Sequence, residues 1–218
     1  MLAGCAGNVP AGRRYAKVID AHAHWYPREF VRLLETEGEA NGAKMGRDDR
    51  GNTVVKSVPG STQTSVLRRN MIEPELLLKE MAERGIDMYV LSMTNPMVYW
   101  APPEFGLKLS QLYNDCCAAA HEQYPQRFVG MMMAPMQAPE LAVQEIERAA
   151  KLPGVRGLYM ATHVNGKNLD DESLFPVYAA CERLGLPIFL HPMMINNERL
   201  KQFYLINLCG NQIGRAHV

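Results

Sequence analysis

Short, continuously apolar runs alternate with amphipathic stretches along most of the chain. Each apolar run is separated from the next by about a dozen residues of helical periodicity, with turn-forming residues between them. Apolar strands that alternate with helices are typical of βαβ units around a parallel sheet. The pattern therefore predicts an α/β fold, with strands at 16–21, 86–93, 127–133, 154–161 and 187–191 and helices at 74–85, 104–124, 139–151 and 173–185.

Residues 36–70 interrupt this rhythm. They are rich in Gly, Asp, Asn, Ser and Thr, and only Val54-Val55 and Val66-Leu67 strongly indicate strands. Because a structureless segment of this length is unusual inside a compact domain, we expect an insertion that forms a functional loop or a hairpin.

Composition then narrows the class of protein. The 218 residues contain 23 Lys or Arg and 23 Asp or Glu, without basic runs, which argues against a nucleic-acid partner. No apolar run reaches the roughly 18 residues of a membrane span. Five cysteines without a C-x-x-C pair fit a reducing compartment and predict a cytoplasmic protein. The alternative is a lipoprotein whose signal peptide is missing upstream of Cys5, since residues 2–5 match a lipoprotein cleavage box.

The sharpest chemical feature is Asp20-Ala21-His22-Ala23-His24, at the end of the first predicted strand. Side chains two residues apart on a strand point to the same side, so His22 and His24 can hold one metal ion. His191 ends the fifth predicted strand, and active sites of parallel barrels gather at these strand ends. The three histidines therefore predict a site for Zn²⁺ or a similar divalent ion. The alternative is a set of half-buried structural histidines.

Other chemistry has weaker support in the sequence. His121 lies inside a predicted helix and is interpreted as a solvated surface residue. His163 follows the fourth predicted strand, where it either faces the site or stabilises a turn. The sequence has no G-x-S-x-G, P-loop or G-x-G-x-x-G motif, which leaves metal chemistry as the strong candidate.

Six motifs in order resemble the amidohydrolase-related (amidohydrolase 2) family, in particular its aminocarboxymuconate-semialdehyde decarboxylase-like members. They are VIDAHAH (18–24), VYWA (98–101), MQAPELA (136–142), THVN (162–165), LFPVYAA (174–180) and LHP (190–192). The resemblance implies a distorted (β/α)₈ TIM barrel of the metal-dependent hydrolase superfamily. It also implies one catalytic Zn²⁺, with Mn²⁺ in some relatives, and no organic cofactor.

The same resemblance implies an activity and roles for single residues. The activity is the metal-dependent, non-oxidative decarboxylation of a hydroxy-aromatic or muconate-semialdehyde-type carboxylic acid. His22, His24 and His191 match the family's metal ligands. Arg68 matches the arginine that binds the substrate carboxylate, a pairing that suits the guanidinium fork. The expected partner is a small carboxylic acid substrate, and no membrane partner is expected. The full-length parent is expected to be a homodimer.

Two alternatives stay open. The first is a metal-dependent hydrolase or hydratase of the same superfamily that acts on a lactone or an unsaturated dicarboxylate. The second is a non-catalytic α/β binding module with an incidental H-x-H motif.

The number of strands adds an expectation about the extent of the chain. Five strands are predicted, whereas the implied barrel has eight. We therefore expect an N-terminal extension at 1–15 and a partial barrel at 16–211. The resemblance also implies a general acid/base histidine and an aspartate ligand, which we expect beyond residue 218. Residues 212–218 are interpreted as a read-through tail, because their codons can spell a sequencing adapter, and His217 as an artefact. Exposed strand edges are expected to make the polypeptide as written inactive and prone to aggregation.

Overall fold

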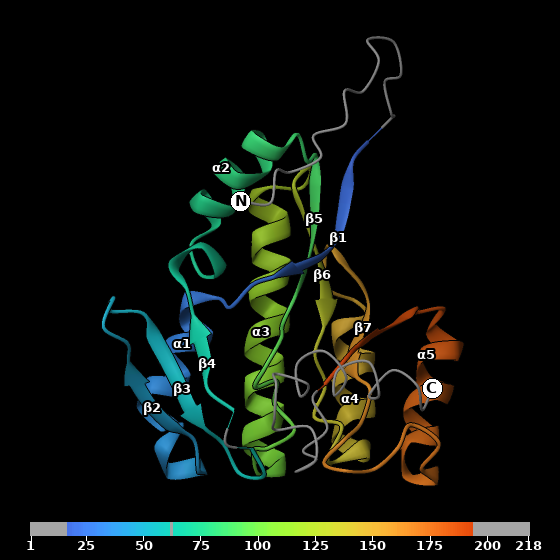
Figure 1. Ribbon diagram of the computed structural model, residues 1–218. Helices are drawn as coiled ribbons and strands as arrows, with labels where there is room; N and C mark the ends of the chain where they lie inside the picture. Colours follow the sequence, from blue (N-terminus) through green and yellow to red (C-terminus); the bar gives the residue numbers. More distant parts are fainter. Residues whose placement is uncertain (1–16, 62, 194–218) are drawn as a thin grey trace, which may run out of the picture.

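Five parallel strands form the main sheet of the computed structural model, which describes residues 17–61 and 63–193 (Figure 1). The order across the sheet is β1-β5-β6-β7-β8, and every neighbouring pair is parallel. The strands are β1 (Ile19–His24), β5 (Met88–Ser92), β6 (Phe128–Met132), β7 (Val155–Ala161) and β8 (Ile188–His191). The α/β prediction is confirmed, and the first strand lies three residues later than predicted because its pairing with β5 begins at Ile19.

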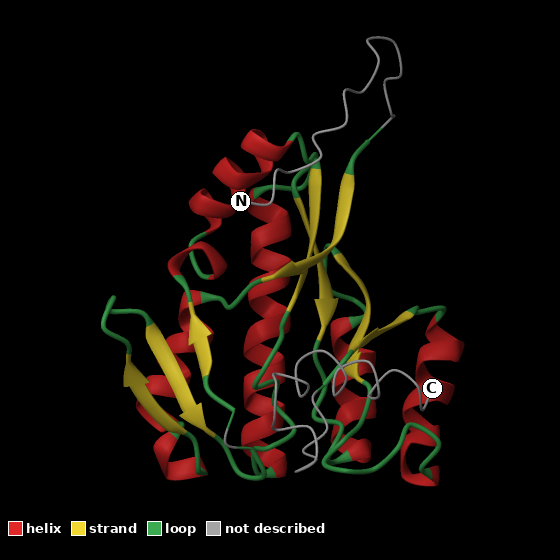
Figure 2. Cartoon of the chain, viewed as in Figure 1, coloured by secondary structure: helices red, strands yellow, loops and turns green. Residues whose placement is uncertain are grey.

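The four predicted helices are also confirmed. They are α2 (Pro74–Arg84), α3 (Pro103–Gln123), α4 (Pro139–Ala149) and α5 (Phe175–Leu184), and Figure 2 shows them alongside the strands. Three of them begin at a proline, which suits a first helical turn because its missing N–H has no intrahelical partner there. Gly85 ends α2 and Gly185 ends α5, both in the left-handed conformation that glycine adopts without a steric penalty.

One further helix, α1 (Arg28–Glu37), was not predicted. It buries Phe30, Val31 and Leu34, and Leu34 lies three and four residues after the other two, the spacing of a single helix face. The signal was therefore present, although the helix begins after Pro27 without a side-chain cap.

The segment at 36–70 contains a second, smaller sheet. Its strands are β2 (Lys44–Arg47), β3 (Thr53–Ser57) and β4 (Ser65–Leu67), paired antiparallel in that order. Both strand indications are confirmed, since Val54-Val55 lies in β3 and Val66-Leu67 in β4, with Val55 and Leu67 buried. The polar strand β2 was missed because it lacks an apolar alternation. Short 3₁₀ turns flank this region at Glu39–Asn41 and Arg69–Met71, and a third precedes α5 at Glu172–Leu174.

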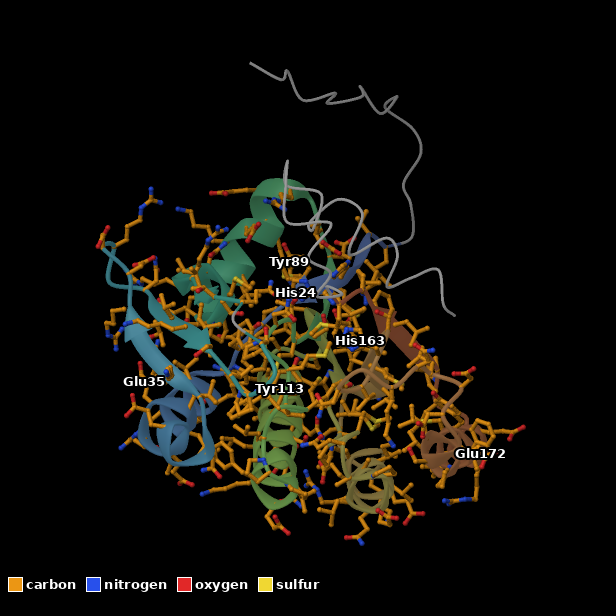
Figure 3. All side chains as sticks on the ribbon, turned by 60° about the horizontal axis from the view of Figure 1, so that its bottom comes forward. His24, Glu35, Tyr89, Tyr113, His163 and Glu172 are labelled. Atoms are coloured by element: carbon orange, nitrogen blue, oxygen red, sulfur yellow. The ribbon has the colours of Figure 1, made fainter. Side chains whose placement is uncertain are left out.

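The core lies between the main sheet and its helices. Helix α3 presents a stripe with four-residue spacing, Phe105, Leu109, Tyr113 and Cys117, all buried. Gly130 of β6 lets this helix approach closely, because a Cβ there would lie 2.6 Å from the Cβ of Cys117. Figure 3 shows Tyr113 well inside the molecule, with Glu35 and Glu172 at its rim.

A buried polar network joins α3 to α4. The side chain of Asn114 donates to Glu145 (2.6 Å) and to the carbonyl of Met133, and accepts from the Met133 amide. Arg148 closes the network with two hydrogen bonds of 2.8 Å to the Glu145 carboxylate. The buried carboxylate is therefore paired, which is the condition for keeping a charge inside a protein.

Among residues 17–61 and 63–193, no helix combines the length and the apolarity that crossing a bilayer requires. The predicted N-terminal extension with Cys5 and the predicted tail with His217 lie outside the described residues.

Candidate metal centre

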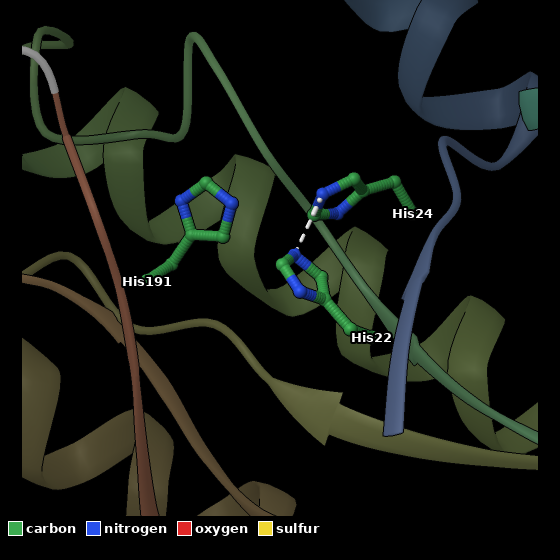
Figure 4. A group of neighbouring side chains, drawn as sticks. All are labelled: His22, His24 and His191. Carbon is green, nitrogen blue, oxygen red and sulfur yellow. Dashed lines mark hydrogen bonds between the residues drawn. The ribbon is translucent and has the colours of Figure 1, made fainter. Parts of the chain in front are cut away.

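Three histidines from the two outer strands of the main sheet converge on one point. His22 and His24 lie on β1 and His191 ends β8, and the nitrogens that could bind a metal all lie within 4.8 Å of one another. In a flat sheet, strands four places apart are about 19 Å apart. The sheet must therefore curve strongly for these side chains to meet, and Figure 4 shows their rings turned toward a common space.

A local irregularity in β1 precedes the site. Asp20 pairs with Tyr89 and Ala23 pairs with Leu91, so β1 has one more residue than β5 over this interval. Such a bulge leaves a backbone group unpaired and redirects the side chain beside it. The carboxylate Oδ1 of Asp20 accepts the amide of His22 at 2.9 Å and so satisfies the backbone at the bulge. The sequence motif contained Asp20, but no role was predicted for it.

The geometry of the three rings fits a metal ion. The Nε2 atoms of His22 and His24 are 3.0 Å apart, and the ring centroids of both lie 5.2 Å from that of His191. Two nitrogens at 2.0–2.1 Å from a tetrahedral zinc would be roughly 3.3 Å apart. His24 Nδ1 is buried and has no hydrogen-bond partner within the described part of the chain. Three imidazoles with room for a further ligand are typical of catalytic zinc sites.

The electrostatics keep His24 in the form that binds metals. Burial, together with the neighbouring His191 and His22 imidazoles, lowers the pKa of His24 to about 4. Since only the neutral imidazole has a lone pair to donate, His24 is ready to bind a cation at neutral pH without losing a proton.

Aromatic and small side chains surround the three histidines. Tyr159 stacks on Phe189 with centroids 5.5 Å apart, and it also lies 5.4 Å from the His191 ring. On neighbouring strands, the residues in register with the histidines are small, since Ser92 pairs with His24 and Ala161 with His191. The aromatic pair supports the site from one side, and the small residues leave space beside the rings. Sequence reasoning identified none of these neighbours.

The prediction for His121 was wrong. This residue is half-buried, and its Nδ1 lies 2.7 Å from the carbonyl oxygen of Phe128. Its ring packs directly over Gly154, where an added Cβ would lie 2.1 Å from the ring atom Cγ. The packing of α3 onto the sheet brings this position into contact with the loop before β7, which helical periodicity alone does not show.

Arg68 lies apart from the histidines, on a surface cavity of about 510 Å³. The cavity is lined by Asp48, Arg50, Asn52, Val66, Arg68, Arg69, Asn70 and Leu76, and Arg68 is exposed. The chain that follows Arg68 is nevertheless attached to the end of β1. The amide of Tyr26 donates to the Met71 carbonyl at 2.7 Å, and the Trp25 indole donates to the Ile72 carbonyl at 3.1 Å. These two hydrogen bonds join the segment after Arg68 to the chain directly after His24.

Comparison with known proteins finds related sequences and structures. The sequence profile of the amidohydrolase family matches residues 19–208. The 2-amino-3-carboxymuconate-6-semialdehyde decarboxylase of Dictyostelium discoideum is 34% identical over 194 residues, which make up 88% of this chain and 54% of that protein. The chain thus spans about half the length of this relative.

Two solved structures share the fold. The 5-carboxyvanillate decarboxylase of Sphingomonas paucimobilis has a TM-score of 0.71 and 25% identity, over 92% of this chain and 62% of the other. The 5-carboxyvanillate decarboxylase of Novosphingobium aromaticivorans, complexed with manganese and 4-hydroxy-3-methoxy-5-nitrobenzoic acid, has a TM-score of 0.68. Its identity is 22%, over 89% of this chain and 55% of the other.

Proposed function

The chain belongs to the amidohydrolase family, and we propose that its histidine centre serves a metal-dependent, non-oxidative decarboxylase of a hydroxy-aromatic or muconate-semialdehyde-type carboxylic acid. The observation that carries this proposal is the convergence of His22, His24 and His191 at the carboxyl ends of parallel strands. The similarity to a decarboxylase over 88% of the chain supports the same reaction class.

The reaction needs a bound acid, a proton donor and a route for CO₂. The bond between the carboxylate group and the carbon that carries it breaks, and CO₂ leaves. That carbon receives one proton, so the acid anion and a proton become CO₂ and the same compound without its carboxylate. A divalent ion in this site would supply Lewis-acid stabilisation of substrate oxygens.

Residues of this chain have separate parts in that scheme. His22, His24 and His191 would hold the ion, and Asp20 would fix the orientation of His22 through its amide. Arg68 would bind a substrate carboxylate with its guanidinium fork. We assign the proton transfer to a histidine and the fourth metal position to an aspartate, both expected beyond residue 218.

We propose Zn²⁺ as the resident ion and Mn²⁺ as the second choice. Three imidazole nitrogens suit zinc, whereas oxygen-rich sites suit manganese. The manganese in the Novosphingobium decarboxylase supports the second choice. Elemental analysis of intact protein, purified without added metal, tests this order.

The central experiment measures CO₂ release by the intact, metal-loaded protein from aromatic acids that carry a ring hydroxyl, with lactones and unsaturated dicarboxylates assayed in parallel. We expect CO₂ from at least one hydroxy-aromatic acid. Lactone opening or hydration without CO₂ release would instead support the hydrolase or hydratase alternative. The binding-module alternative predicts no turnover of any kind and no loss of function in His22→Ala or His191→Ala.

Cellular setting and assembly are further parts of the proposal. We place the protein in the cytoplasm, which the free thiols of Cys116, Cys117 and Cys181 support because a reducing compartment keeps cysteines unpaired. We propose a partial barrel over residues 16–211 and a homodimer for the intact protein. Subcellular fractionation and sedimentation of the intact protein test these two points.

A further inference from the structure

His163 has an unusual hydrogen-bonding state. Both of its ring nitrogens are closed off from solvent, and neither has a hydrogen-bond partner among residues 17–61 and 63–193. A neutral imidazole always carries one N–H donor and one acceptor nitrogen. Buried polar groups in native proteins are nearly always hydrogen-bonded. We therefore expect the His163 ring to form a hydrogen bond with a bound molecule.

The backbone places His163 beside the metal centre. Ala161 is in register with His191, and the amide of the next residue, Thr162, donates to the His191 carbonyl at 3.0 Å. Thr162 also accepts the amide of Met193 through its hydroxyl at 3.1 Å. Tyr159 and Ala161 lie on the side of the sheet that contacts His191, and His163 follows Ala161 by two residues, in the bend directly after β7.

The turn that follows does not use the His163 ring. Val164 and Lys167 exchange two backbone hydrogen bonds of 3.0 and 2.9 Å, and Gly166 adopts a φ of 87°. The side chain of Asn165 donates to the Tyr99 carbonyl at 2.7 Å and ties the turn to the loop after β5. Of the two sequence-based interpretations of His163, turn stabilisation by its ring therefore has no contact to support it.

We propose that His163 binds the substrate, through a hydrogen bond to a hydroxyl or amino group on the ring or chain that carries the carboxylate. This inference rests on the proposed function. Position 163 lies one step beyond the level of His191 toward the open end of the strands, where a bound acid would sit. The proposed function already gives the carboxylate to Arg68, so the substituent is the group left for His163. A site built to hydrogen-bond a hydroxyl strongly rejects analogues that lack it.

The test compares His163→Leu with His163→Gln in intact, metal-loaded protein. Calorimetry gives the affinities for 2-hydroxybenzoate and benzoate, which differ only in the hydroxyl. We expect His163→Leu to reduce the preference for 2-hydroxybenzoate at least tenfold and His163→Gln to retain most of it, with benzoate affinity and metal content unchanged. An unaltered preference in His163→Leu overturns the inference. If that variant does not fold, ¹⁵N spectra of the wild-type His163 ring decide, since a shift with 2-hydroxybenzoate and none with benzoate is expected, and no shift with either overturns it.

The two proposals fail separately in these experiments. Release of CO₂ by the wild type together with an unaltered preference in His163→Leu leaves the proposed function standing and removes the role of His163. If binding depends on His163 but no acid releases CO₂, the role of His163 in binding stands and the proposed function fails. Wild-type protein that binds neither probe overturns both.

Discussion

The Nε2 atoms of His22 and His24 lie 3.0 Å apart, with His22 exposed and His24 half-buried. The two rings meet because alternate residues of β1 point to the same side, and His191 completes the group from the opposite edge of the sheet. A cation that binds all three would couple the two outer strands.

Removal of any one of the three histidines is expected to abolish tight metal binding. Loss of a group that only supports a ligand costs 10- to 100-fold in affinity, so His22→Ala, His24→Ala or His191→Ala should each cost at least about 100-fold. Metal content after dialysis against a weak chelator measures this. His121→Gln, which alters a histidine bonded to the Phe128 carbonyl, serves as the control and should retain the metal. Full metal content in His191→Ala would remove the proposed site.

The carboxylate of Asp20 is expected to affect metal binding indirectly, through its hydrogen bond to the His22 amide. Asp20→Ala deletes the acceptor of the His22 amide and should weaken metal binding about tenfold, as expected for a supporting group. Asp20→Asn keeps an oxygen acceptor in the same place and should stay within about twofold of wild type. Equal losses in both variants would show that the charge of Asp20, not its hydrogen bond, is important.

The metal-free protein is expected to lose stability as the pH falls from about 6.5 to about 4. Burial lowers the pKa of His24 to about 4, so the unfolded chain takes up a proton in this range while the native protein does not. The free energy of unfolding should fall by at most roughly 3 kcal/mol and level off below pH 4. Urea unfolding in the presence of a chelator at pH 7, 5.5 and 4.5 gives the slope. His24→Gln should flatten it, and an identical slope in that variant contradicts the assignment.

Arg68 is expected to act on substrate affinity. Arg68→Gln should raise KM for the acid by about 10- to 150-fold, the range for loss of a hydrogen bond to a charged group, with a smaller effect on kcat. Arg68→Lys should have a KM between those of the wild type and Arg68→Gln, because an ammonium keeps the charge but not the bidentate fork. Arg50→Gln, in the same cavity, is the matched control and should leave KM unchanged. An equal rise in both glutamine variants would point to the charge of the cavity as a whole.

Two glycines with similar backbone angles should respond differently to alanine. Gly154 has a φ of 75° and Gly185 a φ of 64°, but an added Cβ meets the His121 ring at the first and open space at the second. Gly185→Ala should cost about 1 kcal/mol from the left-handed backbone alone. Gly154→Ala adds overpacking and should cost about 2–4 kcal/mol. Thermal unfolding of both variants tests the difference, and equal shifts in Tm would mean that His121 moves aside freely.

The main sheet could be predicted from the sequence for physical reasons. Apolar strands such as 154–161, and glycines such as Gly85 and Gly185, mark local structure because burial and backbone strain act within a few residues. The histidines of the proposed metal site could be selected because they lie at the ends of predicted strands. Helix α1 was missed because, unlike α2–α5, it has no proline in its first turn, and β2 was missed for lack of an apolar face.

Features that depend on distant packing could not be read from the chain. The bulge at Asp20 arises only when β1 pairs with β5, and the surroundings of His121 arise only when α3 lies on the sheet. The unpaired state of His163 is likewise a property of the folded loop after β7. Sequence patterns identify residue types and periodicity, whereas these contacts join residues far apart along the chain.

The arrangement of the metal ligands on the first and last strands of the described sheet has a consequence for synthesis. His22 and His24 leave the ribosome early, but their third partner is His191, so a nascent chain has only two of the three ligands until β8 has emerged. At 5–20 residues per second, the 167 residues from His24 to His191 correspond to roughly 8–33 seconds of translation. Tight capture of the proposed ion would thus be postponed until the sheet has curved, and metal loading would be a late step in the biogenesis of the protein.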